Sequence, residues 1–501
     1  MEPASFIAVD FGTQSLRALL VSDGGETLDA VQLASPNFID SPTEPQRKEY
    51  QPSAVISLLE SALKQLTSKH HPALSQLRGI SITCQRNCLI ALDTNARPIS
   101  NLVHWSDKRR ASKLVPMPWY QRLAFAVAGV SERIHLLRQK AIVNVWSEGS
   151  DIMQKANKVV QLSAWLQWHL CQTLVDSDAS QIGYLPFNFK TGVWYPSYNW
   201  RYKALAITSK QLPKLVPPCQ RLGCVTAEVA QKTGLPVGLP VYAAGSDKAC
   251  ESFASGGGLA GVANISLGSA ATISVEAASY QEAYRYLPAF PSIANNQHIV
   301  EIQLEQGLWL LSLLLQQFGL QEQQQAQSLQ LSVESLVMQH IDTIPIGCNG
   351  LTIKPTEDEQ AILAKIYASK SSAQGLTNTQ RYQAYRACLE GVLFGLKREF
   401  HRVQACSDSK ITTLRVSGGG SQSKQLLQMV ADLFNLPVET IHTHQACALG
   451  AAMCVAVGSG RYRDITQARE QMAHVKQRFL PNRENSARYQ KYHQDRRQQH
   501  G

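Results

Sequence analysis

Short apolar stretches separated by turn residues predict a β-sheet at the start of the chain. Phe6–Val9 is continuously apolar, Leu16–Ser22 is mostly apolar, and a third strand is expected from Thr27. Asp10 follows the first stretch directly, and the turn Gly12–Ser15 carries a glycine and two hydroxyls. The pattern therefore predicts an acidic side chain at a strand end, next to a tight polar turn.

This turn has two interpretations. A glycine lets backbone N–H groups and hydroxyls approach phosphate oxygens closely, and an acid at the strand end can hold hydrated Mg²⁺ against the same phosphates. The same residues also suit an ordinary hairpin with no ligand. The choice depends on the rest of the chain.

A similar pattern recurs later. Gly261–Leu267 is rich in small and β-branched residues and leads into Gly268-Ser269-Ala270-Ala271-Thr272. Two such units suggest two related domains that face each other across a cleft. Val241–Ala244 predicts another buried strand, after which a helix begins at Asp247 and is broken by glycines at 256–258. We expect domains at residues 1–257 and 258–501.

The remaining periodicity predicts mainly helices. Further expected elements are helices at 156–170 and 380–403, a core helix segment at 308–315, a strand at 413–417, a helix from Ser421, and surface insertions at 321–330 and 357–372. The last residues have the spacing of an amphipathic helix with Tyr489 and Tyr492 on one face.

Composition excludes several classes of protein. The 501 residues are 44% hydrophobic and 17% charged, which is typical of a globular chain large enough for two cores. The net charge is +10, but from Arg461 onward there are ten Lys/Arg and four Asp/Glu, so most of the positive excess lies in this last segment. A solvated helix is therefore a better explanation of the charge than a nucleic-acid-binding surface. No apolar stretch is long enough for a bilayer. No leader pattern is recognisable, so the cytoplasm is expected, with the eleven cysteines reduced. The His70-His71 and His442-x-His444 pairs lack partners nearby, so no metal is expected there.

Three segments could carry chemistry, each with a plainer alternative. Asp247 follows a buried strand and is either a general base or a helix N-cap. Gly418–Ser421 can lie flat against a ring or phosphate, or form a connector. Cys84–Asn87, between two strand-like stretches, offers directional donors for hydroxyls or forms a polar turn. Trp105 and Asp107 could add a stacking face and an acceptor, or be packed.

In combination, these pieces resemble the FGGY carbohydrate kinases, the family of glycerol, xylulose and gluconate kinases. The resemblance covers essentially the whole chain. Asp10-x-Gly-Thr-x-Ser15 and Leu267-Gly-Ser-Ala270 are similar to the two phosphate motifs, and Gly245-Ser-Asp247 is similar to the segment of the catalytic aspartate. Ser417–Ser423, continuing to Asp432 and Leu436-Pro-Val438, resembles the adenosine motif. Helical signatures at 389–394 and 448–452 and the ending from Phe479 also match.

The resemblance implies a fold, a reaction and roles for individual residues. The fold class is α/β, with two actin- or hexokinase-like (ribonuclease-H-like) domains whose mixed sheets flank a nucleotide cleft. The reaction is ATP-dependent phosphorylation of a hydroxyl, with Mg²⁺ held at Asp10 and Asp247 as the general base. Nucleotide contacts are implied for Gly12, Thr13, Gln14, Ser15, Gly268, Ser269, Thr272, Gly418, Gly419, Gly420, Ser421 and Gln422. Substrate contacts are implied for Gln85, Arg86, Asn87, Trp105, Asp247 and Lys248.

The substrate segment departs from the family pattern. Arg86 and Trp105 match the glycerol kinases, but Asn87 stands where a glutamate is usual and Lys248 where a glutamine follows the aspartate. Residues 174–184 look more like the sugar kinases. The expected substrate is therefore a small polyol, ketose or sugar acid, with glycerol itself or a catalytically silent nucleotide sensor as alternatives. Residues 356–361 lack the usual Gly-Glu-Arg stretch of a loop that carries dimer contacts, so a homodimer is expected only as a possibility.

Overall fold

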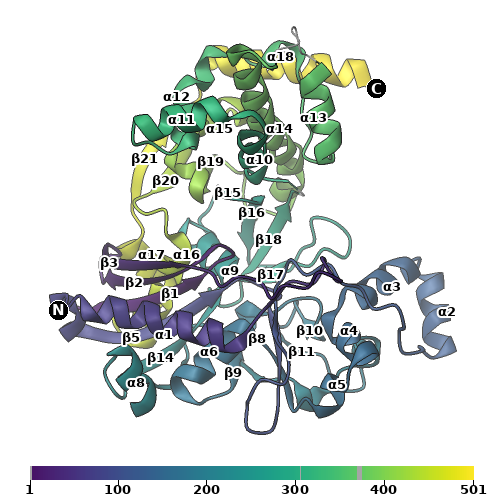
Figure 1. The fold of residues 1–501 in the computed structure, drawn as a ribbon, viewed down its shortest axis with the longest axis vertical. Helices are drawn as coiled ribbons and strands as arrows, with labels where there is room; N and C mark the ends of the chain where they lie inside the picture. The colour runs from purple at the N-terminus through teal and green to yellow at the C-terminus, as the bar shows by residue number, and fades with distance from the viewer. Residues whose placement is uncertain (1–2, 305, 369–374, 501) are drawn as a thin grey trace. The chain divides into compact units, whose positions relative to one another are not determined.

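The computed structural model describes residues 3–304, 306–368 and 375–500 (Figure 1). The chain divides into two compact units. Unit 1 comprises residues 1–254, 288–298 and 447–473, and unit 2 comprises residues 255–287, 299–446 and 474–501. The first change of unit along the chain falls after Ala254, and two later segments return to unit 1. The functional boundary expected after residue 257 stays a prediction.

Unit 1 is built on a mixed sheet of six strands in the order β13-β14-β5-β1-β2-β3. The antiparallel ribbon β1–β2–β3 continues through parallel β5 and β14 to antiparallel β13. Its strands are β1 (Ser5–Phe11), β2 (Ser15–Ser22), β3 (Thr27–Ala34), β5 (Leu77–Cys84), β13 (Arg221–Cys224) and β14 (Pro240–Ser246). The three strands expected at the chain start are therefore confirmed, as is the strand before Asp247.

Smaller sheets and helices surround this sheet. One smaller sheet holds β4 (Glu49–Tyr50), β7 (Leu102–Val103), β6 (Leu89–Leu92) and β8 (Lys158–Gln161), and two pairs are β9 (Val175–Ser177) with β12 (Lys214–Val216) and β10 (Phe187–Asn188) with β11 (Val193–Trp194). The residues of unit 1 also include the short strand β17 (Phe290–Pro291), which is not part of these smaller sheets. The helices are α1 (Pro52–Ser68), α2 (Trp119–Val127), α3 (Ser131–Lys140), α4 (Ile142–Gly149), α5 (Ile152–Lys155), α6 (Leu162–Cys171), α7 (Trp200–Ala204), α8 (Ala227–Thr233), α9 (Asp247–Ala254), α16 (Ala446–Gly458) and α17 (Ile465–Met472). Apolar faces of α1 and α6 join the sheet in one hydrophobic core.

Unit 2 repeats the sheet of unit 1. Its strands lie in the order β18-β16-β15-β19-β20-β21, and the pairings from β16 to β21 are antiparallel, parallel, parallel and antiparallel, as from β2 to β13 in unit 1. They are β15 (Val262–Leu267), β16 (Ala271–Ala277), β18 (His298–Gln303), β19 (Thr413–Ser417), β20 (Val438–Ile441) and β21 (Val475–Phe479). This repeat agrees with the two related domains expected from the sequence.

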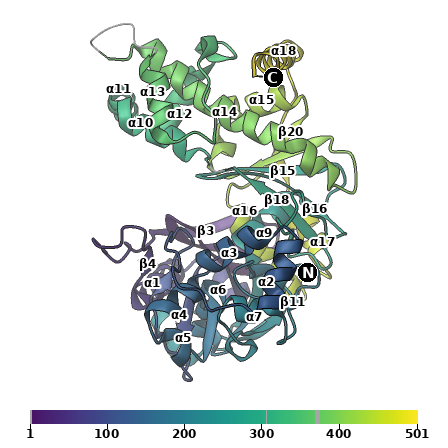
Figure 2. The same ribbon diagram turned by 90° about the vertical axis from the view of Figure 1, so that its right-hand side faces the viewer.

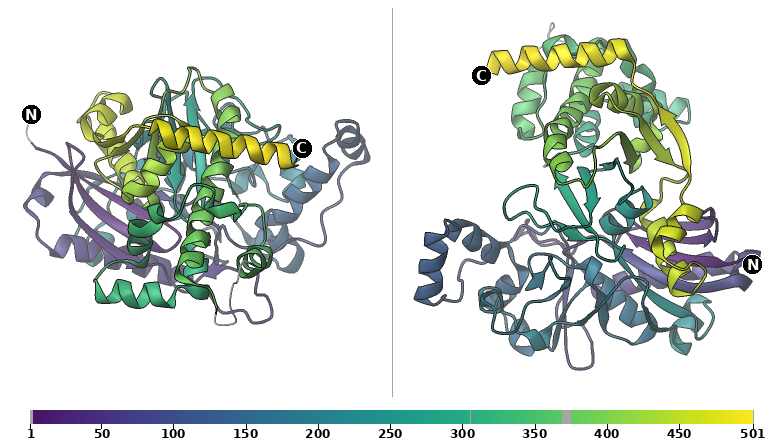
Figure 3. Two further views of the ribbon diagram at one scale, coloured as in Figure 1. Left: turned by 90° about the horizontal axis from the view of Figure 1, so that it is seen from above. Right: turned by 180° about the vertical axis from the view of Figure 1, so that it is seen from behind.

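The helices of unit 2 gather on one side of its strands (Figure 2). They are α10 (Trp309–Phe318), α11 (Leu320–Ser328), α12 (Val333–His340), α13 (Glu359–Ala368), α14 (Asn378–Ala405), α15 (Lys424–Phe434) and α18 (Arg483–His500). Figure 3 shows α18, in yellow, along the green helices of unit 2. Tyr489 on α18 is buried, so the expected amphipathic tail helix is anchored through its tyrosine face.

Two expected helices start later than the sequence suggests. Residues 158–161 form β8, because Val159 and Val160 are buried in pairing with β6, and the helix begins at Leu162. After the glycine triplet, residues 419–422 form a 3-10 turn and α15 begins at Lys424, where the Ser423 hydroxyl accepts the N–H of Leu426. Of the insertion expected at 357–372, residues 369–372 lie outside the described residues.

Candidate functional site

The predicted site residues of unit 1 gather at the carboxyl ends of three parallel strands. In the register of the sheet, Asp10 on β1 lies beside Thr83 on β5, and Ser246 on β14 lies beside Cys84. The Thr83 hydroxyl also donates to the carbonyl of Gly245 over 2.9 Å. Ligands of open α/β sheets bind outside the carboxyl ends of such strands. The fold therefore brings the turn 12–15, the segment 84–87 and Asp247 to one edge.

Asp10 is a buried carboxyl with an unusual charge environment. Its side chain is only 5% exposed, and Arg17 on β2 forms an ion pair with it at 3.4 Å. Burial, followed by the negative charge of Asp247, raises the pKa of Asp10 to about 7, and Glu251 raises it further while Arg17 opposes the shift. The negative groups of this edge are therefore close enough to repel one another.

The structure shows that Ser246, the residue before Asp247, caps α9. The hydroxyl of Ser246 accepts the N–H of Ala249 at 3.3 Å, which is the N-cap contact at the start of α9. The Asp247 carboxylate accepts the adjacent N–H of Lys248 at 2.7 Å, which is not the contact of an N-cap. Burial raises its pKa, against the positive charges of Lys248 and Arg86. Because Ser246 caps the helix, Asp247 is not needed for that purpose.

Lys248 pairs with an acid on its own helix. Its ammonium lies 2.7 Å from Glu251, three residues further along α9, and Glu251 is 93% buried by its side-chain and backbone surface taken together. The Lys248 charge is also the first among the influences that lower the pKa of Asp247. Lys248 thus partly balances the negative charge of this edge.

The phosphate-like turn and the substrate segment are joined by hydrogen bonds. Gln85 accepts from the Thr13 hydroxyl at 3.1 Å and donates to the carbonyl of Gly12 at 3.4 Å. The indole N–H of Trp105 also donates to the Thr13 hydroxyl, at 3.1 Å, while the Trp105 ring is 42% exposed. His104 contacts Gln85 at 3.0 Å. Thr13, Gln85 and Trp105 thus form one cluster, whereas Gln14 is exposed beside it.

Arg86 and Asn87 follow this cluster in the same loop. The guanidinium of Arg86 stacks on the ring of Phe290 at 4.0 Å, and its charge lowers the pKa of Asp247. Asn87 adopts a left-handed backbone conformation with φ of 64°, which asparagine tolerates better than most residues. The loop therefore holds Arg86 where its positive charge favours the ionised form of Asp247.

Sequence reasoning missed three residues at this edge. Phe290, which supports Arg86, comes from a segment more than 200 positions away. Glu251 carries the third negative charge near Asp10. Asp178, in a 3-10 turn, has its pKa raised to about 7 by burial and by Asp176. The adjacent Ala179 packs against Gly245, because a Cβ on that glycine would lie 3.1 Å from Ala179. No local motif marks these positions.

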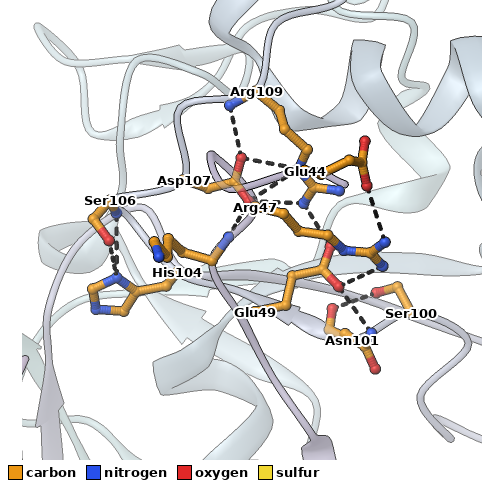
Figure 4. A network of polar contacts seen from close by, with 10 residues as sticks. Glu44, Arg47, Glu49, Ser100, Asn101, His104, Ser106, Asp107 and Arg109 are labelled. Carbon is orange, nitrogen blue, oxygen red and sulfur yellow. Dashed lines mark hydrogen bonds and ion pairs between the residues drawn. The ribbon is translucent and has the colours of Figure 1, made fainter. Parts of the chain in front are cut away.

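Asp107 is held by hydrogen bonds within unit 1. Its carboxylate accepts from Arg109 Nε at 3.0 Å and from the backbone N–H of Lys48 at 2.9 Å (Figure 4). Both oxygens are therefore engaged within the protein, which favours the packed alternative for this residue.

The predicted residues of unit 2 form a second cluster, again at strand ends. Ser266 on β15 lies beside Ser417 on β19, so the turns 268–271 and 418–422 are neighbours. A Cβ on Gly418 would lie 2.8 Å from the carbonyl oxygen of Leu267, and one on Gly420 would lie 2.7 Å from the Leu267 Cβ. Only glycine permits this close approach of the two turns.

The remaining positions of the cluster differ in exposure. Gly419, Gln422 and Ser269 are exposed, and no atom lies within 4 Å of a Cβ built on Gly419. The Ser421 hydroxyl donates to the Gly418 carbonyl at 2.7 Å, which fixes the turn. Thr272 is 2% exposed on β16. The open backbone at Gly419 is suited to a flat ligand. The Thr272 side chain, in contrast, is buried within strand β16.

The acid within the adenosine-like motif is structural. Asp432 on α15 accepts from Gln428, from the N–H of Asn482 and from the side chain of Asn485 at 2.7–2.9 Å. These contacts hold the C-terminal segment on α15, and both carboxylate oxygens of Asp432 already accept hydrogen bonds within unit 2.

The donor set of unit 1 fits a hydrated magnesium ion. Mg²⁺ in phosphoryl-transfer sites uses one or two carboxylates, several waters and phosphate oxygens rather than a cage of protein ligands. Among the described residues, no group of three or more His, Cys, Asp or Glu side chains could hold a metal by itself. Asp10, with a pKa raised by burial and then by neighbouring negative charge, is the carboxylate that a cation would favour in its ionised form.

Two repeated mixed sheets, each with a turn that contains glycine at its carboxyl edge and one with buried acids beside it, have the architecture of the actin and hexokinase fold class. Comparison with family models is specific. The N-terminal domain model of the FGGY family of carbohydrate kinases matches residues 5–254, and the C-terminal domain model matches residues 269–459. The chain belongs to the FGGY family of carbohydrate kinases. Members of this family use ATP with Mg²⁺.

Individual relatives extend over nearly the full chain at low identity. A xylulose kinase from Lactococcus lactis is 26% identical over 97% of this chain and 95% of its own length. A gluconokinase from Bacillus subtilis is 23% identical over 91% and 88%. Among solved structures, a ligand-bound xylulose kinase from Lactobacillus acidophilus superposes with a TM-score of 0.77 at 19% identity, covering 97% and 96%. A glycerol kinase from Plasmodium falciparum gives 0.73 at 15% identity, covering 99% and 98%. The fold and the carbohydrate kinase class are therefore established.

No helix in the described part of the chain has the length and hydropathy that a membrane crossing requires.

Proposed function

We propose that this kinase transfers the γ-phosphoryl group of ATP to a terminal hydroxyl of a small polyol, ketose or sugar acid. The main observation in support is that Asp10, Asp247 and the Thr13–Gln85–Trp105 cluster lie together at one edge of the sheet. Within this class a ketose is the preferred candidate substrate, because several of the relatives that match almost the whole chain are xylulose kinases.

Each residue has a chemical task in this proposal. Asp247 accepts the proton of the attacking hydroxyl, and its raised pKa makes it a better base than an exposed aspartate. Asp10 positions Mg²⁺ through its waters, and the backbone and hydroxyls of Gly12, Thr13, Gln14 and Ser15 receive phosphate oxygens. Bound Mg²⁺ supplies positive charge that offsets the charge developing in phosphoryl transfer.

The second cluster supplies the nucleotide contacts in this proposal. Gly268, Ser269 and Thr272 line the second phosphate turn, and Gly418, Gly419, Gly420, Ser421 and Gln422 receive the adenosine. Exposed backbone at Gly419 gives a flat ring room to lie against it. Because these turns carry no acid, repulsion of the phosphates is avoided there.

Substrate hydroxyls are assigned to the loop around Arg86. Gln85, Arg86, Asn87, Trp105 and Lys248 are the proposed contacts besides Asp247. Arg86 is held by Phe290 and therefore presents its guanidinium in a fixed direction. An amide at Asn87 donates as well as accepts, unlike the glutamate usual in glycerol kinases, and this favours a substrate with a carbonyl oxygen over glycerol.

The decisive experiment is coupled ADP release with a panel of polyols, ketoses and sugar acids, comparing wild type with Asp247→Asn. We expect one substrate class to turn over, with kcat lowered at least 100-fold in the variant, since general base catalysis contributes roughly 10²–10⁴-fold. Asp29→Asn is the control, because Asp29 is a carboxylate of the same unit that pairs with Lys69 outside the site. An Asp247→Asn variant with undiminished kcat would contradict the assignment of the base.

Two alternatives make different predictions. A glycerol kinase would show its highest kcat/KM with glycerol. A nucleotide sensor would bind ATP without sugar-dependent ADP release, and the presence of both Asp10 and Asp247 argues against it. The cytoplasmic location and the homodimer expected from the sequence stay predictions, which fractionation and sedimentation can test.

A further inference from the structure

Two helices of unit 1 form a hairpin that stands at the edge of this unit. They are α2 and α3, joined by the turn at 128–130 (Figure 1), and Figure 3 shows them in blue at the margin of both its views. We call them the α2–α3 hairpin. Seven of the nine residues of α2 are apolar, yet none of the nine is buried. Apolar helices of globular proteins normally pack on a core, so this exposure needs an explanation.

The inner side of the α2–α3 hairpin is fastened to the rest of unit 1. On α2, the ring of Phe125 packs on Trp200 of α7, with ring centroids 4.9 Å apart. On α3, Arg138 Nε donates to the carbonyl of Ala204 at 3.1 Å. The side chain of Asn144 donates to the same carbonyl at 3.0 Å and to that of Arg138 at 2.8 Å. These contacts fix which side of the hairpin faces away from the unit.

The outer side of α2 carries an apolar stripe. Trp119, Leu123 and Val127 are spaced four residues apart, so they lie along one side of the helix, with Tyr120 beside them. These four side chains are 56–82% exposed. Phe125 follows Leu123 by two residues, which is about 200° around the helix, so the stripe faces away from the packed side. An exposed apolar cluster on a helix that is fixed from behind is typical of an interaction surface.

The segment that contains the α2–α3 hairpin is strongly basic. Residues 108–140 all lie within the described chain, and Glu132 is their one acidic residue. A neighbouring acid, Glu148 of α4, accepts the N–H of Ser112 at 2.6 Å. The exposed cations of the segment are Lys108, Arg110, Lys113, Arg122, Arg133 and Lys140. An apolar stripe therefore lies in a region of positive charge, which attracts an anionic surface.

We propose that the α2–α3 hairpin docks on an anionic lipid surface, with Trp119, Leu123 and Val127 among the headgroups and the cations at lipid phosphates. Tryptophan and tyrosine suit the boundary between lipid and water, because the ring leaves water while its N–H or O–H stays hydrated. Basic side chains add attraction to anionic lipids. The helix α2 has nine residues and is about 14 Å long, so it lies on a bilayer and does not cross its core of about 30 Å.

A second copy of the chain and a folded partner protein fit these observations less well. Pairing about a two-fold axis uses the same patch on both subunits, so the cations of one hairpin would lie against those of the other. A folded partner would need a surface shaped to a projecting helix, whereas a fluid lipid surface adapts to one. The charge of the segment therefore favours anionic lipid as the occupant.

Co-sedimentation of the full chain with lipid vesicles tests the proposal. We expect the protein to pellet with vesicles of phosphatidylcholine and phosphatidylglycerol, and much less with vesicles of phosphatidylcholine alone. Raising the salt from about 0.1 M to about 1 M should weaken binding, because the Debye length falls from about 10 Å to about 3 Å. Anionic vesicles should shift the tryptophan emission to shorter wavelength, and Trp119→Phe should reduce this shift. The measurement needs neither nucleotide nor sugar, so its outcome is independent of the proposed function.

The apolar stripe has its own variant and control. Leu123→Ser combined with Val127→Ser should lower the lipid partition coefficient roughly tenfold or more, because two apolar side chains then no longer leave water. Leu320→Ser combined with Val237→Ser is the matched control, because this leucine and valine are also largely exposed and lie outside the hairpin. The control should bind as wild type does.

The basic part is tested in the same way. Lys113→Gln combined with Arg122→Gln should weaken binding to the anionic vesicles several-fold, since two charges that face lipid phosphates are removed. Arg78→Gln combined with Lys210→Gln removes the same net charge from exposed positions outside the segment, and should weaken binding much less.

Several outcomes would overturn the proposal. One is the absence of binding to anionic vesicles, and another is binding that Leu123→Ser with Val127→Ser leaves unchanged. Equal binding to both kinds of vesicle would overturn the anionic part. Dimers in sedimentation equilibrium that the same double variant abolishes, without lipid binding by wild type, would identify a second copy as the occupant instead. The thermal unfolding of each variant should match that of wild type, because the substituted side chains are exposed, and this separates lost binding from lost folding.

Discussion

The protonation of Asp10 makes a quantitative prediction for Asp10→Asn. In the protein without ligands, burial and the charge of Asp247 raise the pKa of Asp10 from 3.8 to about 7. Folded protein therefore keeps a proton between these pH values that unfolded chain has lost. Stability falls as pH rises through this window, and the loss is complete above the folded pKa. Asparagine cannot ionise, so the variant lacks this pH dependence.

The size of the effect follows from the shift. It spans roughly three pH units, and each unit corresponds to 1.36 kcal/mol, which gives an upper value of about 4 kcal/mol. The free energy of unfolding of Asp10→Asn, minus that of wild type, should therefore rise by up to about 4 kcal/mol between pH 4 and pH 8. The side chain is only 5% exposed, so solvent screening reduces this value little.

Urea denaturation at one-unit pH steps, without nucleotide or Mg²⁺, measures this difference. Seven of the eight tryptophans lie in unit 1, so tryptophan emission follows the unit that contains Asp10. Asp29→Asn is a control of opposite sign, because the hydrogen bond and charge of Lys69 outweigh desolvation and lower the pKa of Asp29. Parallel stability curves for wild type and Asp10→Asn would refute the reasoning, since they would mean that Asp10 ionises normally in the folded protein.

Three further changes test the packing and polar contacts around the sites. Gly420→Ala should destabilise by about 1–3 kcal/mol in thermal or urea unfolding, because its Cβ would lie 2.7 Å from the Leu267 Cβ, while Gly419→Ala should be neutral. Tyr489→Phe should cost about 1–3 kcal/mol, because its buried hydroxyl donates to Glu390 at 3.2 Å; unchanged stability would contradict that contact. Burial lowers the pKa of His104 to about 4, so wild type should lose up to about 3 kcal/mol as pH falls from 6.5 toward 4, and His104→Gln should lose less in the same titration.

The strands and turns at the sheet edges were predictable because their signals are local. Phe6–Val9 and Thr413–Ser417 are each followed within three residues by a glycine that favours a turn, and the structure has strands at both places. At 158–161 the sequence predicted a helix, and the structure has a strand. Two valines fit either a buried helix face or a strand, and the pairing with β6 decides between them. Periodicity cannot supply the identity of a partner strand.

Tertiary neighbours account for the parts of the site that sequence reasoning missed. Phe290 matters because it lies under Arg86, and Asp178 because burial raises its pKa to about 7. Neither residue stands in a pattern that differs from an ordinary loop. The role of Ser246 was equally hidden, since a serine and an aspartate at adjacent positions compete as caps until hydrogen bonds are known.

Lys248 shows how a departure from the family pattern can be understood from charge. Asp10, Asp247 and Glu251 place three acids near one sheet edge, and Glu251 raises the pKa of both aspartates. A glutamine at position 248 would leave Glu251 without the ammonium that now lies 2.7 Å away. The positive charge of the lysine lowers the pKa of Asp247 and so favours its ionised form, which the proposed role as general base requires. The acid on the next turn of α9 thus accounts for the lysine within the protein, beside the substrate contact proposed for it.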